Sequence, residues 1–338
     1  MKAPAEPSVG AFCPSLRCAS NLLYCSLHHA AATAPPHSRE PQTTAPIPSR
    51  KYSMIVVITA FTLVAFAANS LLCRMALGSG LIDPVSFTTL RLASGALTLV
   101  PLSWLFAQSE PRTGSGGSWA SGFALFAYAG AFSLAYVSLN TGMGALILFG
   151  SVQVTMMGFA LRSGEALNVA QGLGSLAAVA GLVYLVLPGL SAPDPLGALL
   201  MAVAGIAWGI YSIRGRGGAA PVRMTAGNFQ RSAPFALLAS LLAVGSIHMA
   251  PNGVLLALAS GIVTSGMGYI LWYKALRTLR TTQASVLQLL VPVIAAFGGV
   301  AFLSEEVSFR LLIGSALILG GVVVAVVRRV PAPPATAS

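Results

Sequence analysis

Charged residues are scarce in this chain. Asp, Glu, Lys and Arg together make up 8% of its 338 residues, whereas an average soluble domain carries about 25%. Hydrophobic residues make up 56%, and the mean hydropathy is +0.80. A surface with so little charge cannot face water over most of its area, so the composition excludes an ordinary soluble protein and indicates a polytopic membrane protein.

Acidic residues are missing from the middle of every long apolar run. Glu165, Glu305 and Glu306 lie at the ends of such runs. Exchange of a cationic drug for protons generally needs an intramembrane carboxylate, and the first run, 53–77, has none. The sequence therefore disfavours a cationic-drug/proton antiporter.

Signatures of catalysis and of metal binding are also missing. The apolar runs hold no His pair, and no Gly-rich phosphate loop occurs, so neither a membrane-embedded enzyme nor an ATP-driven pump is indicated. Cys13, Cys18 and Cys25 are spaced more widely than zinc-binding pairs. We expect no enzymatic activity, no cofactor and no metal.

Apolar runs follow one another from Ser53 onward, with short breaks rich in Gly, Pro and charge. Each run is about long enough to cross ~30 Å of hydrocarbon as a helix, and backbone groups in lipid must be paired internally. The sequence therefore predicts an all-α integral membrane fold of ten transmembrane helices, at 53–77, 84–106, 118–139, 142–161, 166–187, 195–213, 231–248, 252–273, 281–303 and 308–327.

The net charge of +11 reflects topology and does not point to nucleic acid, because the basic residues lie in short loops between apolar runs. With the N-terminus inside, nearly all loop Arg and Lys fall on the inner side. The outer ends then hold only Arg74 and Arg310. The positive-inside rule predicts a multi-pass protein of the plasma (inner) membrane with both termini cytoplasmic.

The two ends of the chain differ from the rest. Residues 1–52 are rich in Pro, Ala, Ser and Thr and hold no long apolar run, which is typical of a disordered N-terminal tail. A targeting segment, or a mis-assigned start with translation beginning at Met54, are the alternatives. Residues 328–338 are expected to form a cytoplasmic C-terminal tail.

The chain resembles itself at an offset of about 140 residues. The segment Ala67 to Arg74 aligns with Ala207 to Arg214, and further matches keep the same order through five spans. Because five is odd, the second half enters the membrane from the opposite side. This predicts two inverted five-helix repeats, 53–188 and 195–327, an architecture that many secondary transporters use for alternating access.

The chain also resembles the EamA-type transporters of the drug/metabolite transporter superfamily between about 53 and 327. The residues that carry the resemblance are Asp83-Pro84, Arg91, Tyr136, Gly144-Ala145-Leu146, Gly164-Glu165, Gly205 to Tyr211, Ser265-Gly266, Tyr269, Trp272-Tyr273, Ala275-Leu276, Pro292 and Glu305. The resemblance implies a ten-helix fold and the export or exchange of small metabolites, often amino acids or related compounds.

One departure from the family pattern concerns a proline late in span four. Val152-Gln153 stands where the family has that proline, whereas the second half keeps Pro292. A helix proline frees a backbone carbonyl and permits a kink. Pro292 is therefore a candidate kink or gating residue, and the two halves are expected to move unequally if the kink matters.

Arg91 is the principal candidate for substrate binding, because it lies about two turns inside span two and an intramembrane ion is a functional candidate. Its guanidinium suits a carboxylate or phosphate. The alternatives are snorkelling to the outer interface or pairing with a neighbouring carbonyl. The other candidates are polar or aromatic residues that either line a cavity or only join or anchor helices: Asn69, Gln153, Trp208, Tyr211, Tyr269 and Gln288.

These patterns favour a secondary transporter, an exporter or exchanger of a small neutral, zwitterionic or anionic metabolite such as an amino acid. A membrane scaffold or receptor-like protein without transport remains the alternative. The expected partners are a small-molecule substrate and the lipid bilayer, without nucleic acid. The oligomeric state, monomer or homodimer, stays open.

Overall fold

The computed structural model describes residues 49–105, 116–163, 169–187, 192–216, 220–279, 284 and 287–327. Across these residues the chain is helical, and the β-structure there is a single isolated bridge between Ile82 and Met249. The predicted tails before residue 49 and after residue 327 lie outside the described residues. The Gly164-Glu165 motif lies outside them as well.

The described residues of the first half form five helices. They are α2 (Ser49–Gly78), α3 (Pro84–Leu105), α4 (Trp119–Ala135), α5 (Thr141–Arg162) and α6 (Val169–Val186). Helix α2 begins four residues before the predicted first span. Ser118 caps α4, because its side chain accepts a hydrogen bond from the backbone of Ser121.

The second half holds more interruptions. Its helices are α7 (Pro195–Gly215), α8 (Pro221–Leu242), α9 (Pro251–Ala259), the π-helical segment η2 (Ser260–Met267), α10 (Gly268–Leu276), α12 (Leu290–Leu303) and α13 (Phe309–Val327). The segments α9, η2 and α10 follow one another without a break. Helix α8 begins ten residues earlier than the predicted span at 231–248. Within the predicted span at 281–303, Leu290–Leu303 form α12.

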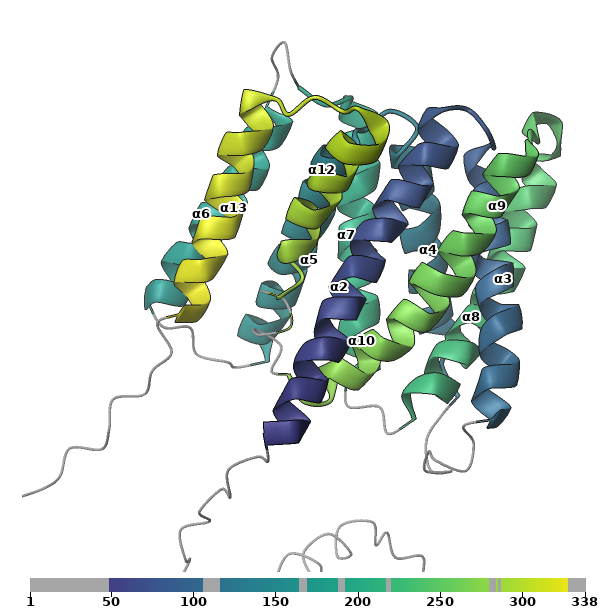
Figure 1. The fold of residues 1–338 in the computed structure, drawn as a ribbon, viewed down its shortest axis with the longest axis horizontal. Coiled ribbons are helices and arrows are strands. Elements are labelled where there is room, and N and C mark those ends of the chain that lie inside the picture. Colours follow the sequence, from purple (N-terminus) through teal and green to yellow (C-terminus); the bar gives the residue numbers. More distant parts are fainter. Residues whose placement is uncertain are drawn as a thin grey trace, which may run out of the picture. The chain divides into compact units, whose positions relative to one another are not determined.

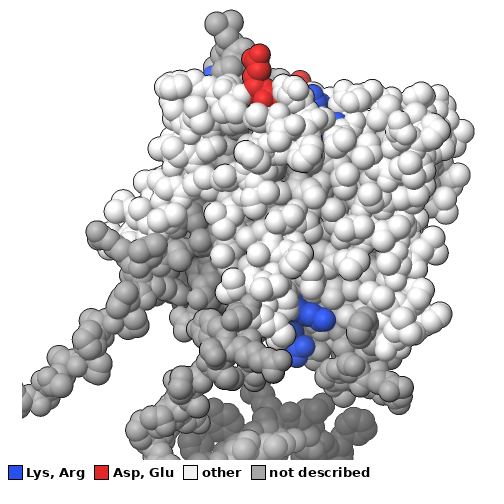
Figure 2. Space-filling model, in the orientation of Figure 1, with Lys and Arg blue, Asp and Glu red and all other residues white. Residues whose placement is uncertain are grey.

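Apolar surface covers the outside of these helices. Five helical stretches have the length and hydropathy to cross a membrane, and shorter apolar helices accompany them. Large side chains such as Leu97, Phe297 and Phe309 are about three-quarters exposed. Figure 2 shows Lys, Arg, Asp and Glu at two opposite edges of one face, with a broad uncharged band between them. This distribution is that of a multi-pass membrane protein.

The helices pack mainly between the two halves of the chain. Helix α6 lies along α13 at one side of the bundle, while α3 packs on α8 (Figure 1). Between these pairs, α4 and α5 pack on α7, and α10 and α12 pack on α2. The buried residues of both halves form one continuous core, so the centre of the bundle is built jointly.

Candidate functional site

Arg91 of α3 lies at the centre of the bundle and is 1% exposed. Helix α3 packs closely on η2 because Gly261 has no side chain. A Cβ atom there would collide with the Ser94 hydroxyl and the Arg91 carbonyl. The prediction left open whether Arg91 snorkels to the interface, and its burial excludes that alternative.

The Arg91 guanidinium is held by neutral oxygens and aromatic rings. Its Nε donates to Ser265 Oγ at 2.9 Å, and its Nη2 donates to Tyr128 Oη at 3.1 Å and Tyr269 Oη at 2.9 Å. The guanidinium carbon lies 5.2 Å from the ring centroids of both Tyr128 and Phe132, within cation–π range. Nη1 is buried and has no hydrogen-bond partner among the described residues.

Asn69 of α2 joins this network from the other side. Its Oδ1 accepts from the hydroxyls of Ser260 at 2.7 Å and Thr264 at 2.9 Å, and its Nδ2 donates to Tyr128 Oη at 3.4 Å. Tyr128 therefore accepts from both Asn69 and Arg91. The network links α2, α3, α4 and the π-helical segment η2 into one polar cluster inside an apolar bundle.

An aromatic wall surrounds the polar cluster. The Trp208 ring lies 4.7 Å from Tyr269 and 5.0 Å from Tyr128, and Phe66 lies edge-on to Trp208 at 5.4 Å. Trp208 Nε1 donates to Gln288 Oε1 at 2.9 Å, which fixes the indole. The Tyr211 ring lies 5.5 Å from the Trp208 ring and is tilted by 34° against it.

A small cavity of about 10 Å³ lies inside this cluster, roughly the space of one water molecule. It is lined by Phe66, Asn69, Ser70, Tyr128, Phe132, Leu148, Phe149 and Trp208. The hydroxyl of Ser70 is buried without a partner among the described residues. At this size the cavity in this conformer is too small to hold a metabolite.

The structure brings together six of the predicted site residues: Asn69, Arg91, Trp208, Tyr211, Tyr269 and Gln288. Gln153 of α5 is buried, but its amide oxygen has no partner in the described part of the chain, and it takes no part in the network. Pro292 lies in the first turn of α12, where the missing N–H costs no helical hydrogen bond.

Sequence reasoning missed several members of the cluster. Tyr128 binds both Arg91 and Asn69, and it carried no signal beyond a single hydroxyl in an apolar run. Ser260 and Thr264 are four residues apart, a spacing that places both on one helix face. From that spacing, the sequence could have indicated that both hydroxyls meet one acceptor, which is Asn69.

Arg74 and Glu305 form a second polar cluster at the end of α2. Arg74 Nε lies 3.5 Å from Glu305 Oε1, and Arg74 Nη1 donates to the carbonyls of Tyr136 and Val137. Both Glu305 oxygens accept from the backbone N–H of Thr141 at 2.9 Å. Glu305 thus caps α5 from the loop between α12 and α13. The cluster joins this loop and α5 to α2 and to the loop between α4 and α5.

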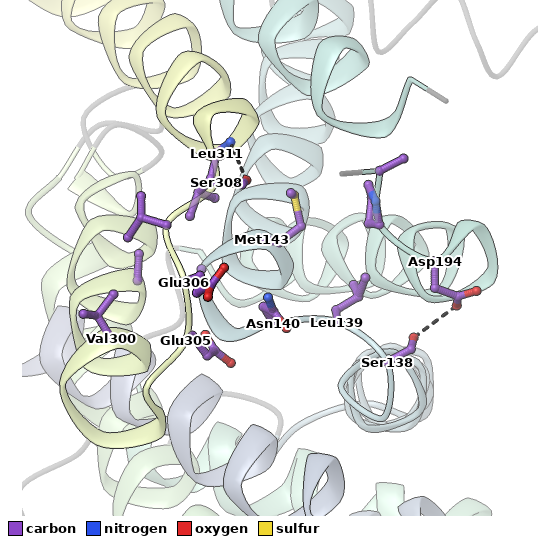
Figure 3. A pocket seen from close by; sticks show the side chains of 15 residues that line it. Ser138, Leu139, Asn140, Met143, Asp194, Val300, Glu305, Glu306, Ser308 and Leu311 are labelled. Carbon is purple, nitrogen blue, oxygen red and sulfur yellow. Dashed lines mark hydrogen bonds between the residues drawn. The ribbon is translucent and has the colours of Figure 1, made fainter. Parts of the chain in front are cut away.

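A larger cavity of about 300 Å³ opens beside this second cluster. Figure 3 shows Glu305 and Glu306 on one side of it and Asp194 on the other, where Ser138 donates to Asp194 at 3.1 Å. Asp194 also caps α7 by accepting from the backbone of Gly197. The buried polar groups of the central cluster do not line this cavity. Within the described residues, no group of three His, Cys, Asp or Glu side chains is placed to hold a metal ion.

Asp83 organises the loops near the start of α3. Its carboxyl accepts from the backbone N–H groups of Val85, Ser86 and His248 at 2.8–3.1 Å. Partial burial raises the pKa of this carboxyl, but the hydrogen bonds from Ser86, His248 and Val85 outweigh burial and hold the pKa below its usual value. Asp83 therefore stays ionised as it joins α3 to the loop before α9.

Comparison with known proteins places the chain among transporters. The sequence profile of the EamA-like transporter family matches residues 195–327. An uncharacterized protein of Pseudomonas aeruginosa, PA1977, is 48% identical over 267 residues, which cover 79% of this chain and 92% of that protein. An uncharacterized transporter of Archaeoglobus fulgidus is 26% identical over 284 residues, covering 79% of this chain and 95% of that protein.

A further relative is the uncharacterized transporter YoaV of Bacillus subtilis, which is 25% identical over 47% of this chain and 57% of that protein. A protein crystal structure superposes with a TM-score of 0.58 at 21% identity, covering 81% of this chain and 98% of that one. At this identity the likeness concerns the fold alone. The chain belongs to the EamA-like transporter family of the drug/metabolite transporter superfamily.

Proposed function

We propose that this membrane transporter is a secondary carrier, an exporter or exchanger of a small neutral, zwitterionic or anionic metabolite such as an amino acid. The observation that carries the proposal is the central cluster around Arg91. A buried cation with an unfilled donor, an aromatic wall and a closed cavity form a solute site at the middle of the bundle.

Both halves of the chain contribute to this cluster. Asn69, Arg91 and Tyr128 come from the first half, whereas Ser265 and Tyr269 come from the second. A site at the interface of two repeats changes its accessibility when the repeats rock against each other. This placement supports alternating access.

The helix contacts support two inverted five-helix repeats, with α2, α3, α4, α5 and α6 matched in order to α7, α8, α9–α10, α12 and α13. Helix α4 packs on α7, and its counterpart α10 packs on α2. Helix α5 packs on α7, and its counterpart α12 packs on α2. The contacts α3–α8, α5–α12 and α6–α13 map onto themselves. A two-fold axis that exchanges the halves accounts for this pattern.

The charge distribution supports an orientation with both termini cytoplasmic in the inner membrane. Acidic Asp83, Asp194 and Glu305 lie between helices at one end of the bundle, whereas Arg214 and Lys274 lie in the last turns of helices that run to the other end. Basic residues are retained on the cytoplasmic side of membrane proteins.

Counterflow tests the proposed function. The full chain is reconstituted in liposomes preloaded with unlabelled amino acids or organic anions, and uptake of the labelled solute is followed. A carrier accumulates label transiently, and Arg91→Ala abolishes that accumulation, whereas Arg310→Gln at the contact of α13 with α6 retains it. A wild-type protein that shows no transient accumulation with any solute would contradict the carrier and favour the scaffold alternative.

A further inference from the structure

We propose that the central site selects an organic monoanion, whose carboxylate or equivalent group binds the guanidinium of Arg91. The inference rests on the proposed function and names the substrate class of its site. It starts from the charge of Arg91, which the surrounding protein solvates without neutralising.

None of the oxygens that Arg91 binds carries a negative charge. Ser265 offers a hydroxyl, and Tyr128 and Tyr269 offer phenol hydroxyls, which are neutral hydrogen-bonding groups. The acidic residues that the structure describes, Asp83, Asp194, Glu305 and Glu306, all lie in segments between helices. The guanidinium therefore keeps its full positive charge in the middle of an apolar bundle.

One nitrogen of the fork also lacks a partner. Nε and Nη2 make three hydrogen bonds, whereas Nη1 makes none among the described residues although it is fully buried. Both N–H groups of Nη1 are consequently without an acceptor in the described part of the chain. A guanidinium nitrogen donates its strongest hydrogen bonds to anionic oxygens such as those of a carboxylate.

A neutral acceptor would satisfy Nη1 but would leave the charge unpaired. Burying an unpaired charge costs far more than leaving a neutral polar group unbonded. An anion removes both penalties at once, so the site discriminates between a carboxylate and the matching amide. The neutral hydroxyls and rings around Arg91 carry no charge, so the preference for a carboxylate over an amide comes from the guanidinium.

The cavity wall fits the remainder of such a ligand. Tyr128 and Phe132, whose rings face the guanidinium, line the cavity together with the unpartnered hydroxyl of Ser70. Phe66 and Trp208 complete an apolar wall. Among the described residues that line the cavity, no carboxylate is present to pair with an ammonium group. The site therefore suits an anion with an apolar body better than a zwitterion.

Thermal unfolding of the purified full chain in detergent tests the inference with matched probes: sodium propionate against propionamide, and sodium benzoate against benzamide, at constant ionic strength. A ligand that binds the native state raises Tm. We expect the carboxylates to raise Tm in a dose-dependent manner and the amides to have little effect. Arg91→Gln should weaken the carboxylate response at least ~30-fold in concentration, and Arg310→Gln should leave it unchanged.

Arg91→Lys keeps the charge without the fork, so it should retain the preference for carboxylates with about 10-fold weaker binding. This variant carries the test if Arg91→Gln does not fold, and an unchanged response in Arg91→Lys would then overturn the inference. Equal responses to the two members of each pair, including none at all, would also overturn it, as would an unweakened preference in Arg91→Gln. If carboxylates stabilise the protein selectively but no counterflow occurs, the anion site is supported and the carrier function is contradicted. If a neutral solute shows counterflow and carboxylates do not stabilise selectively, the carrier function is supported and the anion site is contradicted.

Discussion

Two arginines from the same half of the chain meet very different surroundings. Arg74, at the end of α2, is 21% exposed and lies beside the carboxylate of Glu305 while donating to two backbone carbonyls. Arg91, in the middle of α3, is 1% exposed and contacts hydroxyls, phenols and rings but no carboxylate. The protein neutralises the first charge, whereas the described neighbours of the second are all neutral.

The contrast separates a cation that joins loops from the cation of the proposed substrate site. Glu305 satisfies Arg74 and caps α5 at the same time, so this pair joins loops at the rim of the bundle. Arg91 is oriented just as firmly, yet one nitrogen stays open. A charge that is fixed in place but unpaired is ready for a ligand, because little side-chain freedom is lost on binding.

The largest expected effect is on transport and affects Arg91 alone. Arg91→Met should reduce counterflow about 100-fold, because an open charged donor in the site is lost. Arg74→Met should leave the half-saturation concentration for the solute within about 3-fold, since Arg74 pairs with Glu305 at the end of α2, away from the central cluster. Counterflow kinetics of the two variants, normalised to folded protein, measure the difference. Similar half-saturation defects in both would erase the distinction between the two arginines.

The next effect is on stability and affects Arg74 and Glu305. Glu305→Gln should lower the free energy of unfolding by about 2 kcal/mol, because Arg74 loses its carboxylate and the cap on Thr141 loses its charge. A double-mutant cycle with Arg74→Gln should show an interaction energy of about 1 kcal/mol. Thermal unfolding of the four proteins gives the cycle. Strict additivity would show that the two side chains act independently.

The fold class followed from the sequence because run length and hydropathy are local properties. A run of about twenty apolar residues has helix as its only stable form in lipid, and the described residues are helical over most of each run. Helix ends were less predictable. Helix α8 starts at Pro221, and its first residues include the polar Arg223 and Asn228. Tertiary contacts bury much of this polar segment.

The candidate site was predictable only in part. Arg91, Asn69 and Trp208 interrupt apolar runs, so each stood out from its neighbours. Tyr269 and Gln288, which bind Arg91 and Trp208, were also candidates. Ser265 was not, because it is 174 residues from Arg91 in sequence and a hydroxyl in lipid is common. Which serine meets the guanidinium is decided by how α3 packs on η2, and that packing depends on a glycine, Gly261.

A smaller effect is expected within the neutral part of the central cluster. Asn69→Leu removes the acceptor of the Ser260 and Thr264 hydroxyls and should cost about 1 kcal/mol of stability. The loss is moderate because Thr264 also donates to the carbonyl of Ser260. Thr62→Val is the matched control on α2, since Thr62 bonds only within its own helix, to Ile58. Equal losses of stability in the two variants would indicate that the contact between α2 and η2 contributes nothing.

The smallest effect depends on pH and concerns a third charged group, Asp83. Like Arg74, it has hydrogen-bond partners within the protein. The pKa of the Asp83 carboxyl is lowered in the folded protein, so its ionised form stabilises the fold above the ordinary carboxyl pKa of about 4. That contribution is lost as pH falls through the lower folded pKa. The free energy of unfolding of the wild type should therefore exceed that of Asp83→Asn by about 0.3–1 kcal/mol near pH 6. This difference should shrink below pH ~4. Thermal unfolding of both proteins from pH 6 to pH 3 measures this difference in stability. If the difference stays constant over that range, the hydrogen bonds of residue 83 join α3 to the loop before α9 without a contribution from its charge.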